Sequence, residues 1–312
     1  PINRKQLVGY RMPASRGTMR FAAHRAADMI YEKLTGIKGV FRTKVAYVTA
    51  KQQGKERLYS LIVSDQDGAN YNKIMESKDP IMSPAWSPDS RQLAYVSFEG
   101  SKSSIFVQTL RTGNRFRVSG KPGINGAPAF SPDGRKLVVT LGGINGNPDI
   151  YILDITSRKA IRLTTHRAID TEGSWSPDGR YIYFTSDRSG GPQVYRISAN
   201  GGTPERFTFE GSYNARPRLS PDGKRLAMVH NDGGNFRIAV MDIKSKNLLI
   251  VSKGQQDESP SFAPNSDNLI YATRQRGDGV LESVSIDGLI RQKMASGQGD
   301  VREPVWSPFP KF

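Results

Sequence analysis

Short apolar runs recur at regular distances along most of the chain, and each run follows a polar turn. The residues in these runs either alternate between apolar and polar or are apolar throughout, which is the pattern of strands with one or two buried faces. No amphipathic helical pattern separates the runs. Five strands are therefore predicted, at residues 92–97, 136–141, 181–186, 225–230 and 268–273.

The polar turn is itself repeated, as a small residue or Pro, any residue, an aromatic residue, Ser-Pro-Asp-Gly and a basic residue. The proline that follows Ser, or Ala in one copy, stands at 88, 132, 177, 221, 264 and 308, at intervals of 44, 45, 44, 43 and 44 residues. Proline presets φ at the second turn position and glycine accepts the positive φ that ends the turn, which favours a hairpin. The aspartates of this turn are predicted to bond turn amides rather than to act in catalysis.

Each repeat supplies four short strands. A second strand follows a Gly-rich connection, as at 149–154 and 193–198, and a short last strand follows another turn, as at 161–164. Four antiparallel strands in about 44 residues are typical of a β-propeller blade. The 270 residues from 43 to 312 hold about six such units, so the predicted fold class is all-β, a six-bladed β-propeller.

The two ends of the array are complementary. The first unit, which begins at Lys44, lacks a leading Pro-x-aromatic strand, whereas the last copy at 304–308 is followed by only four residues. We therefore expect the C-terminal strand to complete the first blade, which would remove an exposed sheet edge.

Residues 1–42 have a different pattern. Thr18 is a candidate N-cap, and helical spacing of apolar residues continues to Gly36, which predicts one amphipathic helix. The apolar positions are Met19, Ala22, Ala23, Ala26, Ile30 and Leu34. A helix that packs on a domain and leaves its basic face in solvent is favoured over a membrane-surface helix, and 42 residues are too few for an independent core.

Charge and composition exclude several classes of protein. The chain has 45 basic and 29 acidic residues, a net charge of +16, no cysteine and no apolar run that could span a bilayer. Nine of the basic residues and two of the acidic ones lie in residues 1–42, and no Lys/Arg cluster stands out. We therefore expect no disulfide, no membrane-spanning segment and no nucleic-acid partner. No secretion signal is readable at the start.

Catalytic constellations are missing from the sequence. There is no Gly-x-Ser-x-Gly elbow, and the three histidines, His24, His166 and His230, have no metal-ligand spacing. Acidic pairs such as Asp257 with Glu258 resemble ordinary loop carboxylates. We expect a protein that is not an enzyme and that needs no cofactor or metal. The alternative is a propeller enzyme, a glycan lyase or hydrolase, that acts at the channel.

A propeller binds most readily where the connections between blades reach the mouth of its central channel. The residues just before each Pro-x-aromatic strand should ring that mouth, and they vary while the turns barely change. The competing interpretation is that these are only solvated loops. The candidate partner-binding residues are Met82, Asn125, Gly126, Ala127, Thr171, Glu172, Asn214, Arg216, Glu258, Arg302 and Glu303.

Several longer stretches resemble one family. They include Tyr31-Glu-Lys-Leu-Thr-Gly-Ile-Lys-Gly-Val-Phe-Arg42, Met82-Ser-Pro-Ala-Trp-Ser-Pro88, Asn125-Gly-Ala-Pro-Ala-Phe-Ser-Pro-Asp-Gly134, Gly191-Pro-Gln-Val-Tyr195 and Asn200-Gly-Gly-Thr-Pro204. Together with Trp306-Ser-Pro308, they make the chain similar to the TolB family, the periplasmic propeller proteins of the Tol-Pal system. The resemblance covers essentially all 312 residues.

The resemblance implies a fold, a location and partners. The family has a signal peptide and a small α/β domain before the propeller, so residues 1–42 would be the C-terminal remnant, strand plus helix, of that domain. It implies a non-enzymatic periplasmic scaffold that binds the lipoprotein Pal at the channel mouth and supports outer-membrane integrity and constriction in cell division. Colicin epitopes imitate Pal there, and TolA binds an N-terminal segment that is missing here. By motif, the Pal site corresponds to Asn125, Gly126, Ala127, Thr171 and Glu172.

Overall fold

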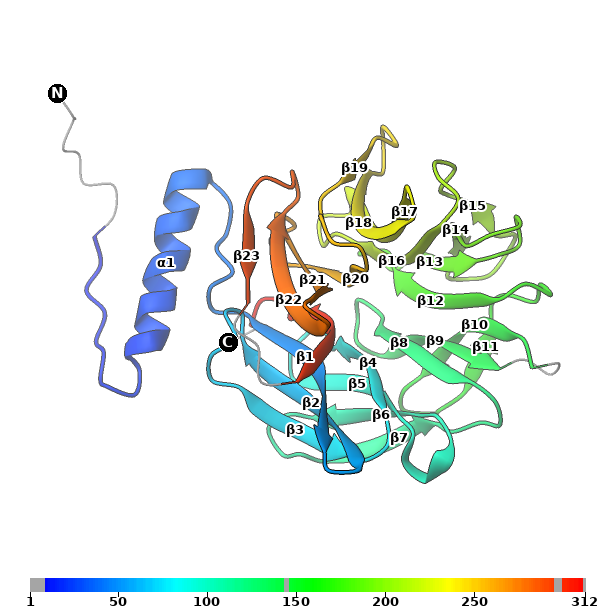
Figure 1. The fold of residues 1–312 in the computed structure, drawn as a ribbon, viewed down its shortest axis with the longest axis horizontal. Helices are drawn as coiled ribbons and strands as arrows, with labels where there is room; N and C mark the ends of the chain where they lie inside the picture. Colours follow the sequence, from blue (N-terminus) through cyan, green and yellow to red (C-terminus); the bar gives the residue numbers. More distant parts are fainter. Residues whose placement is uncertain (1–8, 143–145, 295–298, 311–312) are drawn as a thin grey trace.

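Six four-stranded antiparallel sheets form a ring, with one long helix outside it (Figure 1). The structure, a computed structural model, describes residues 9–142, 146–294 and 299–310. We number the sheets as blades 1 to 6. Blade 1 contains β24 (Asp300–Trp306), β1 (Lys44–Gln53), β2 (Glu56–Asp65) and β3 (Asn72–Ser77); blade 2 contains β4 (Ile81–Trp86), β5 (Gln92–Ser97), β6 (Ser104–Thr109) and β7 (Arg115–Ser119); blade 3 contains β8 (Asn125–Phe130), β9 (Lys136–Gly142), β10 (Pro148–Asp154) and β11 (Ala160–Arg162).

The other three blades repeat the arrangement. Blade 4 contains β12 (Asp170–Trp175), β13 (Tyr181–Ser186), β14 (Gln193–Ser198) and β15 (Glu205–Arg206); blade 5 contains β16 (Asn214–Leu219), β17 (Arg225–Asp232), β18 (Asn235–Asp242) and β19 (Leu248–Ile250); blade 6 contains β20 (Glu258–Phe262), β21 (Asn268–Gln275), β22 (Asp278–Ser285) and β23 (Arg291–Lys293). A 3-10 turn, η1 (Glu99–Ser101), follows β5. The five strands predicted from the apolar runs are all present, with their first residues where expected, and the fold class is confirmed.

The C-terminal strand closes the ring. β24 pairs antiparallel with β1, with Val45 opposite Trp306, and the Ser307 amide donates to the Lys44 carbonyl at 2.8 Å. Blade 1 is thus built from both ends of the array, as predicted, and β1 is paired on both of its edges, with β24 and with β2.

The repeated aspartate stabilises its own turn. Asp133 Oδ1 accepts hydrogen bonds from the Ser131 hydroxyl at 2.6 Å and from the Arg135 amide at 3.0 Å. These two bonds favour the carboxylate and lower the pKa of Asp133. Equivalent pairs of bonds occur at Asp89, Asp178 and Asp222. The structural role predicted for these residues is confirmed.

The core is divided among the contacts between neighbouring blades. Within the described residues there are six buried apolar clusters, one between each pair of adjacent blades. Tyr47 and Tyr95 are fully buried in two of these clusters, so their rings are not available to stack on bases. Trp indoles also link blades: Trp86 Nε1 donates to the Val305 carbonyl at 3.0 Å and Trp175 Nε1 to the Ala129 carbonyl at 3.2 Å.

Helix α1 (Met19–Thr35) begins and ends where predicted, with Gly36 in the left-handed region at φ 73°. Thr18 precedes it, but its side chain caps no helix amide. No strand occurs between residue 9 and α1, and residues 1–8, where part of the expected N-terminal strand would fall, lie outside the described residues.

The orientation of α1 corrects the sequence interpretation. Its polar side faces the propeller: Arg20 Nε donates to Asp65 at 3.1 Å and Tyr31 Oη donates to Asp267 at 3.0 Å. The apolar stripe expected to pack is instead largely exposed, with Met19 and Leu34 at 59% and 66%. Because periodicity shows only that these residues share one face, it could not tell which face meets the propeller.

Candidate functional site

The six inner strands, β4, β8, β12, β16, β20 and β24, begin at one end of the channel with the same irregularity. Every inner strand carries a β-bulge. The bulge contains a non-glycine residue with φ between 45° and 58°. These equivalent residues are Ser83, Ala127, Glu172, Arg216, Ser259 and Glu303. A bulge changes the direction of the side chain it carries. Each blade therefore presents one side chain at the equivalent position around the channel axis.

Two residues before this bulge, blades 3 to 6 each have one buried polar side chain: Asn125, Asp170, Asn214 and Asp257. Asn125 is only 1% exposed, and it accepts from the Lys121 amide at 3.1 Å and donates to the Lys121 carbonyl at 2.7 Å. Asn214 is fully buried and contacts the Glu210 carbonyl at 2.8 Å and His230 Nδ1 at 2.9 Å. Both side chains therefore hold the shape of their own crossover, and the partner-binding role predicted for them stays a prediction.

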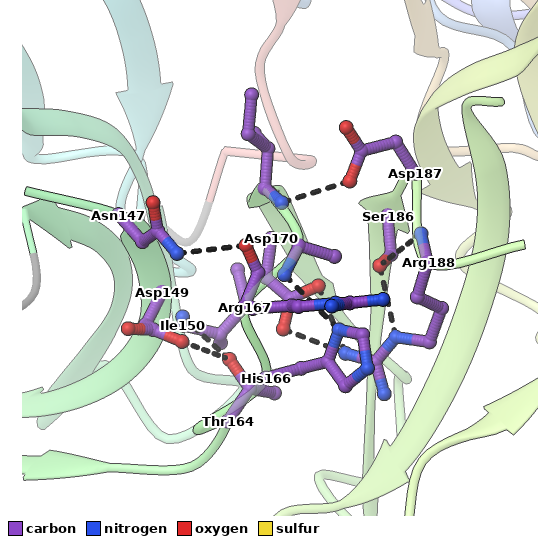
Figure 2. Close-up of polar contacts among 12 residues, drawn as sticks. Asn147, Asp149, Ile150, Thr164, His166, Arg167, Asp170, Ser186, Asp187 and Arg188 are labelled. Atoms are coloured by element: carbon purple, nitrogen blue, oxygen red, sulfur yellow. Dashed lines mark hydrogen bonds and ion pairs between the residues drawn. The ribbon is translucent and has the colours of Figure 1, made fainter. Parts of the chain in front are cut away.

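The crossover between blades 3 and 4, which delivers Thr171 and Glu172, is held in the same way (Figure 2). Arg188 Nη2 donates to both carboxylate oxygens of the fully buried Asp170, at 2.8 and 2.7 Å. The Ile169 amide donates to Asp187 at 2.8 Å. Because charged partners bond Ile169 and Asp170, where the crossover enters β12, the backbone just before Glu172 is fixed.

Arg216 joins several blades across the channel. Its Nε donates to Glu172 at 2.5 Å, its Nη2 lies 3.4 Å from Glu303, and its Nη1 donates to the Ser259 hydroxyl. Glu303 in turn accepts from the Ser83 amide. We call Arg216, Glu172, Glu303 and Ser259 the channel brace. It ties together blades 4, 5, 6 and 1, and blade 2 through Ser83.

The electrostatics of the brace keep it ionised. Burial alone would lower the pKa of Arg216, but the carboxylates of Glu172 and Glu303 outweigh this cost and raise it. Arg218, deeper in the channel, has no such partner within ion-pair distance in the described residues, and burial lowers its pKa. The cation at Arg216 is therefore a permanent charge of the channel.

Two cavities flank the brace. One, of about 360 Å³, lies where blades 5, 6 and 1 meet, and the other, of about 320 Å³, lies between blades 1 and 2. Six of the eleven predicted residues line one or both: Met82, Glu172, Arg216, Glu258, Arg302 and Glu303. Arg302 is neutralised by Asp300, 2.5 Å away, which also accepts from Arg57 at 3.1 Å.

The remaining predicted residues lie beside the cavities. Ala127 lines a small space of about 40 Å³ deeper in the channel, and Thr171 lies next to Thr140, with hydroxyls 3.3 Å apart. Gly126 is half-buried in the bulge of β8.

Exposed apolar side chains also lie where the chain enters the inner strands. They are Met82 in β4, Ile124 directly before β8 and Ile169 directly before β12, with exposures of 39%, 46% and 49%.

Sequence reasoning missed that the charged residues pair with one another, and it missed the cavity walls Tyr213, Phe236 and Thr273. The pairing did leave a signal. Glu172 and Arg216 are 44 residues apart, one repeat, and Arg216 and Glu303 are 87 apart, two repeats. Opposite charges at whole multiples of the repeat occupy equivalent positions in different blades and face one channel.

The described residues contain no cluster of three or more His, Cys, Asp and Glu side chains that could hold a metal ion. Their one long helix is too short and too polar to cross a membrane. His230 is buried against Asn214, and the ring nitrogen of the exposed His166 accepts from the Ala168 amide at 3.0 Å.

Comparison with protein families matches residues 31–310 to the TolB beta propeller domain. The chain belongs to the TolB family. The Tol-Pal system protein TolB of Xanthomonas oryzae pv. oryzae is 49% identical over 307 residues, which span 98% of this chain and 70% of that protein.

Solved structures agree with this assignment. The crystal structure of TolB from Acinetobacter baumannii has a TM-score of 0.90 at 45% identity and covers 96% of this chain and 74% of that one. A putative TolB from Agrobacterium tumefaciens shares the fold alone, with a TM-score of 0.66 at 18% identity over 86% of this chain and 94% of that one. As a TolB-family member, the chain is a non-enzymatic protein of the Tol-Pal system, and the alternative of a propeller enzyme is set aside.

Proposed function

We propose that this TolB-family propeller is a periplasmic scaffold that binds the lipoprotein Pal at its channel mouth, and so supports outer-membrane integrity and constriction during division. The observation that carries the proposal is that six bulged inner strands begin at one mouth, where two cavities lie close to crossovers with exposed apolar side chains. Apolar contacts supply much of the contact area of a protein interface, and nearby charges orient the partner. A colicin epitope that imitates Pal would dock at the same place.

We also infer that residues 1–42 are the end of the family's α/β domain. The exposed apolar stripe of α1 supports this inference, because a stripe of that kind usually packs against another element. TolA would bind through the N-terminal segment of that domain and not through the propeller.

Calorimetric titration with soluble Pal from the same organism tests the site. Met82→Asp and Ile124→Asp place charges on the exposed apolar border, where a folded chain tolerates them, and each should weaken binding at least tenfold. The matched control is Leu289→Asp. Leu289 is 80% exposed in the β22–β23 turn, whose Ile286 amide bonds the Asp267 carbonyl at the opposite face.

Equal binding by all variants would move the Pal site away from the mouth. Absence of binding by the wild-type chain would refute the proposal for this propeller. Circular dichroism melting curves of each variant separate lost binding from lost folding.

A further inference from the structure

The face of the propeller opposite the channel mouth is built from two turns per blade, one after the first strand and one after the third. In blades 2 to 6 an amide of the second turn donates to a carbonyl of the first, as from Leu110 to Arg91 at 3.0 Å. Turns of neighbouring blades also touch, since a Cβ added to Gly134 would lie 3.5 Å from the Pro88 ring. The turns therefore form one continuous surface.

The residue that ends the first turn is basic in four consecutive blades, 2 to 5. These equivalent residues are Arg91, Arg135, Arg180 and Lys224, and all four are exposed. Six more exposed basic residues lie beside them on the same surface: Arg111, Lys136, Arg158, Lys159, Lys244 and Lys246. Because the four equivalents are 44 or 45 residues apart, they form no cluster in the sequence, but the fold gathers them on one face. We call these ten residues the basic face.

The carboxylates among these cations are bonded within their own turns. Asp154, for example, accepts from the amide and the hydroxyl of Ser157. Arg180 lies 3.9 Å from Asp178, and the other nine residues of the basic face form no ion pair within the described part of the chain. Six aspartates stand in these turns against the ten exposed cations: Asp89, Asp133, Asp154, Asp178, Asp222 and Asp242. The surface therefore has an excess of positive charge.

The rest of the same end of the propeller is acidic where helix α1 docks. In blade 6 the residue equivalent to Arg91 is Asp267, which accepts from the Tyr31 hydroxyl at 3.0 Å. In blade 1, Asp65 accepts from Arg20 at 3.1 Å. Among the described residues, the polar contacts of α1 with the propeller are to blades 1 and 6. The helix thus occupies the negative part and leaves the basic face of blades 2 to 5 in solvent.

One space on the basic face has a lining that suits a phosphate group. Its volume is about 590 Å³, and it is lined by Arg91, Arg111, Ser90, Thr109 and Leu110. The two guanidiniums and two hydroxyls can all donate hydrogen bonds, and no carboxylate is among the lining residues. Arginine binds phosphate oxygens well because its planar group offers two parallel donors.

The composition of the basic face favours a lipid surface over a folded protein. None of the large exposed apolar side chains of the described chain lies in the turns of blades 2 to 5. The face thus lacks the aromatic and aliphatic anchors that dominate the binding energy of protein interfaces. Cations spread over four blades at one level match a plane of many phosphates, and each basic residue close to an anionic bilayer adds attraction.

We propose that the basic face binds the surface of a bilayer that contains anionic phospholipids, with one headgroup phosphate in the space between Arg91 and Arg111. The channel mouth lies at the other end of the propeller, so it stays open to a partner while the bilayer is bound. The inference goes beyond the proposed function and does not depend on which partner the mouth binds.

Co-sedimentation of the chain with lipid vesicles tests the proposal. The two preparations are vesicles of phosphatidylcholine alone and vesicles of equimolar phosphatidylcholine and phosphatidylglycerol. The chain should sediment with the anionic vesicles and stay in the supernatant with the neutral ones. Raising sodium chloride from about 50 to about 300 mM should release most of it, because salt screens contacts between exposed charges and a surface.

Two fourfold variants separate the basic face from net charge. Replacing its four equivalent residues should weaken binding to anionic vesicles at least about tenfold; this variant is Arg91→Gln/Arg135→Gln/Arg180→Gln/Lys224→Gln. The matched control removes four exposed cations from the turns and crossover at the mouth side and should bind like the wild type; it is Lys55→Gln/Lys102→Gln/Lys253→Gln/Arg276→Gln.

A pair of double variants tests the headgroup position. Arg91→Gln/Arg111→Gln removes both guanidiniums of the phosphate-sized space, whereas Arg135→Gln/Lys224→Gln removes two cations outside it. The first should weaken binding more than the second. Equal losses would show that the phosphates are not held in that space and would refute this part of the proposal.

The proposal is overturned if the chain binds neither preparation, if it binds both equally, or if the fourfold basic-face variant binds like the wild type. An equal loss in the mouth-side control would overturn it too, because net charge alone would then act. A chain that binds poly-glutamate through the basic face but no vesicle would have an acidic polypeptide as its partner instead. Circular dichroism melting curves show whether each variant is folded.

Discussion

Replacing Arg216 with methionine should destabilise the whole propeller. Methionine keeps much of the aliphatic stem but removes the guanidinium that bonds Glu172, Glu303 and Ser259. Both carboxylates would then remain in the channel without their cation. The variant therefore tests whether the channel brace is a structural element or only a surface ion pair.

The expected loss in the free energy of unfolding follows from how deeply the three charged side chains are buried. The side chains of Arg216, Glu172 and Glu303 are 24%, 19% and 12% exposed. Removing one partner of a buried ion pair costs about 3–5 kcal/mol, whereas an exposed pair contributes about 0–1 kcal/mol. Because these groups retain some solvent contact, we expect about 3 kcal/mol. At about 2–4 °C per kcal/mol for a chain of this size class, the melting temperature should fall by about 6–12 °C.

Urea denaturation and calorimetric melting measure the loss. Arg180→Met is the matched control, because Arg180 is 80% exposed and lies 3.9 Å from Asp178, and it should change stability by less than about 0.5 kcal/mol. The double variant Glu172→Gln/Arg216→Met should be less destabilised than the sum of the two single variants. If Arg216→Met unfolds within about 0.5 kcal/mol of the wild type, the brace does not stabilise the ring and the reasoning is wrong.

Two further predictions concern closure and pH. Deleting residues 300–312 removes β24 and the buried Trp306, so cooperative unfolding should be lost or the melting temperature should drop sharply in calorimetry; an unchanged melting curve would contradict the closure of the ring by this strand. Burial lowers the pKa of His230 below its ordinary value of 6.5, so the unfolded chain binds more protons below about pH 6.5 and stability should fall there as the pH decreases. His230→Gln should flatten this part of the profile in urea titrations between pH 7.5 and 5.5, and an identical slope in both proteins would show that His230 does not contribute.

The architecture could be predicted closely from the sequence because every blade of a propeller repeats the same turn and strand pattern. The turn at Asp133 uses only neighbours in the chain, so its chemistry is visible in any one copy and its period shows the number of blades. The closing strand was also predictable, since an unmatched strand at one end implied a missing strand at the other.

The candidate site was only partly predictable. The positions of Arg216 and Glu303 in the repeat predicted that both lie at the mouth. They did not predict that the two form an ion pair, because this depends on the width of the channel. Asn125 was predicted to contact a partner, and the structure shows that its side chain is buried in hydrogen bonds of its crossover. A sequence pattern cannot distinguish such a buried amide from an exposed one.

The docking of α1 affects how the ring resists force. The non-covalent joint of the ring is the β24–β1 pairing, and the segment before β1 contacts the structure on both sides of that joint. Tyr31 reaches Asp267 in blade 6 and Arg20 reaches Asp65 in blade 1, while Lys38 lies over the Phe309 ring at 4.1 Å. A force applied through the N-terminal end must therefore detach the helix from both blades before it acts on the β24–β1 pairing. In a single-molecule stretching experiment, helix release should precede opening of the ring as a separate, smaller event.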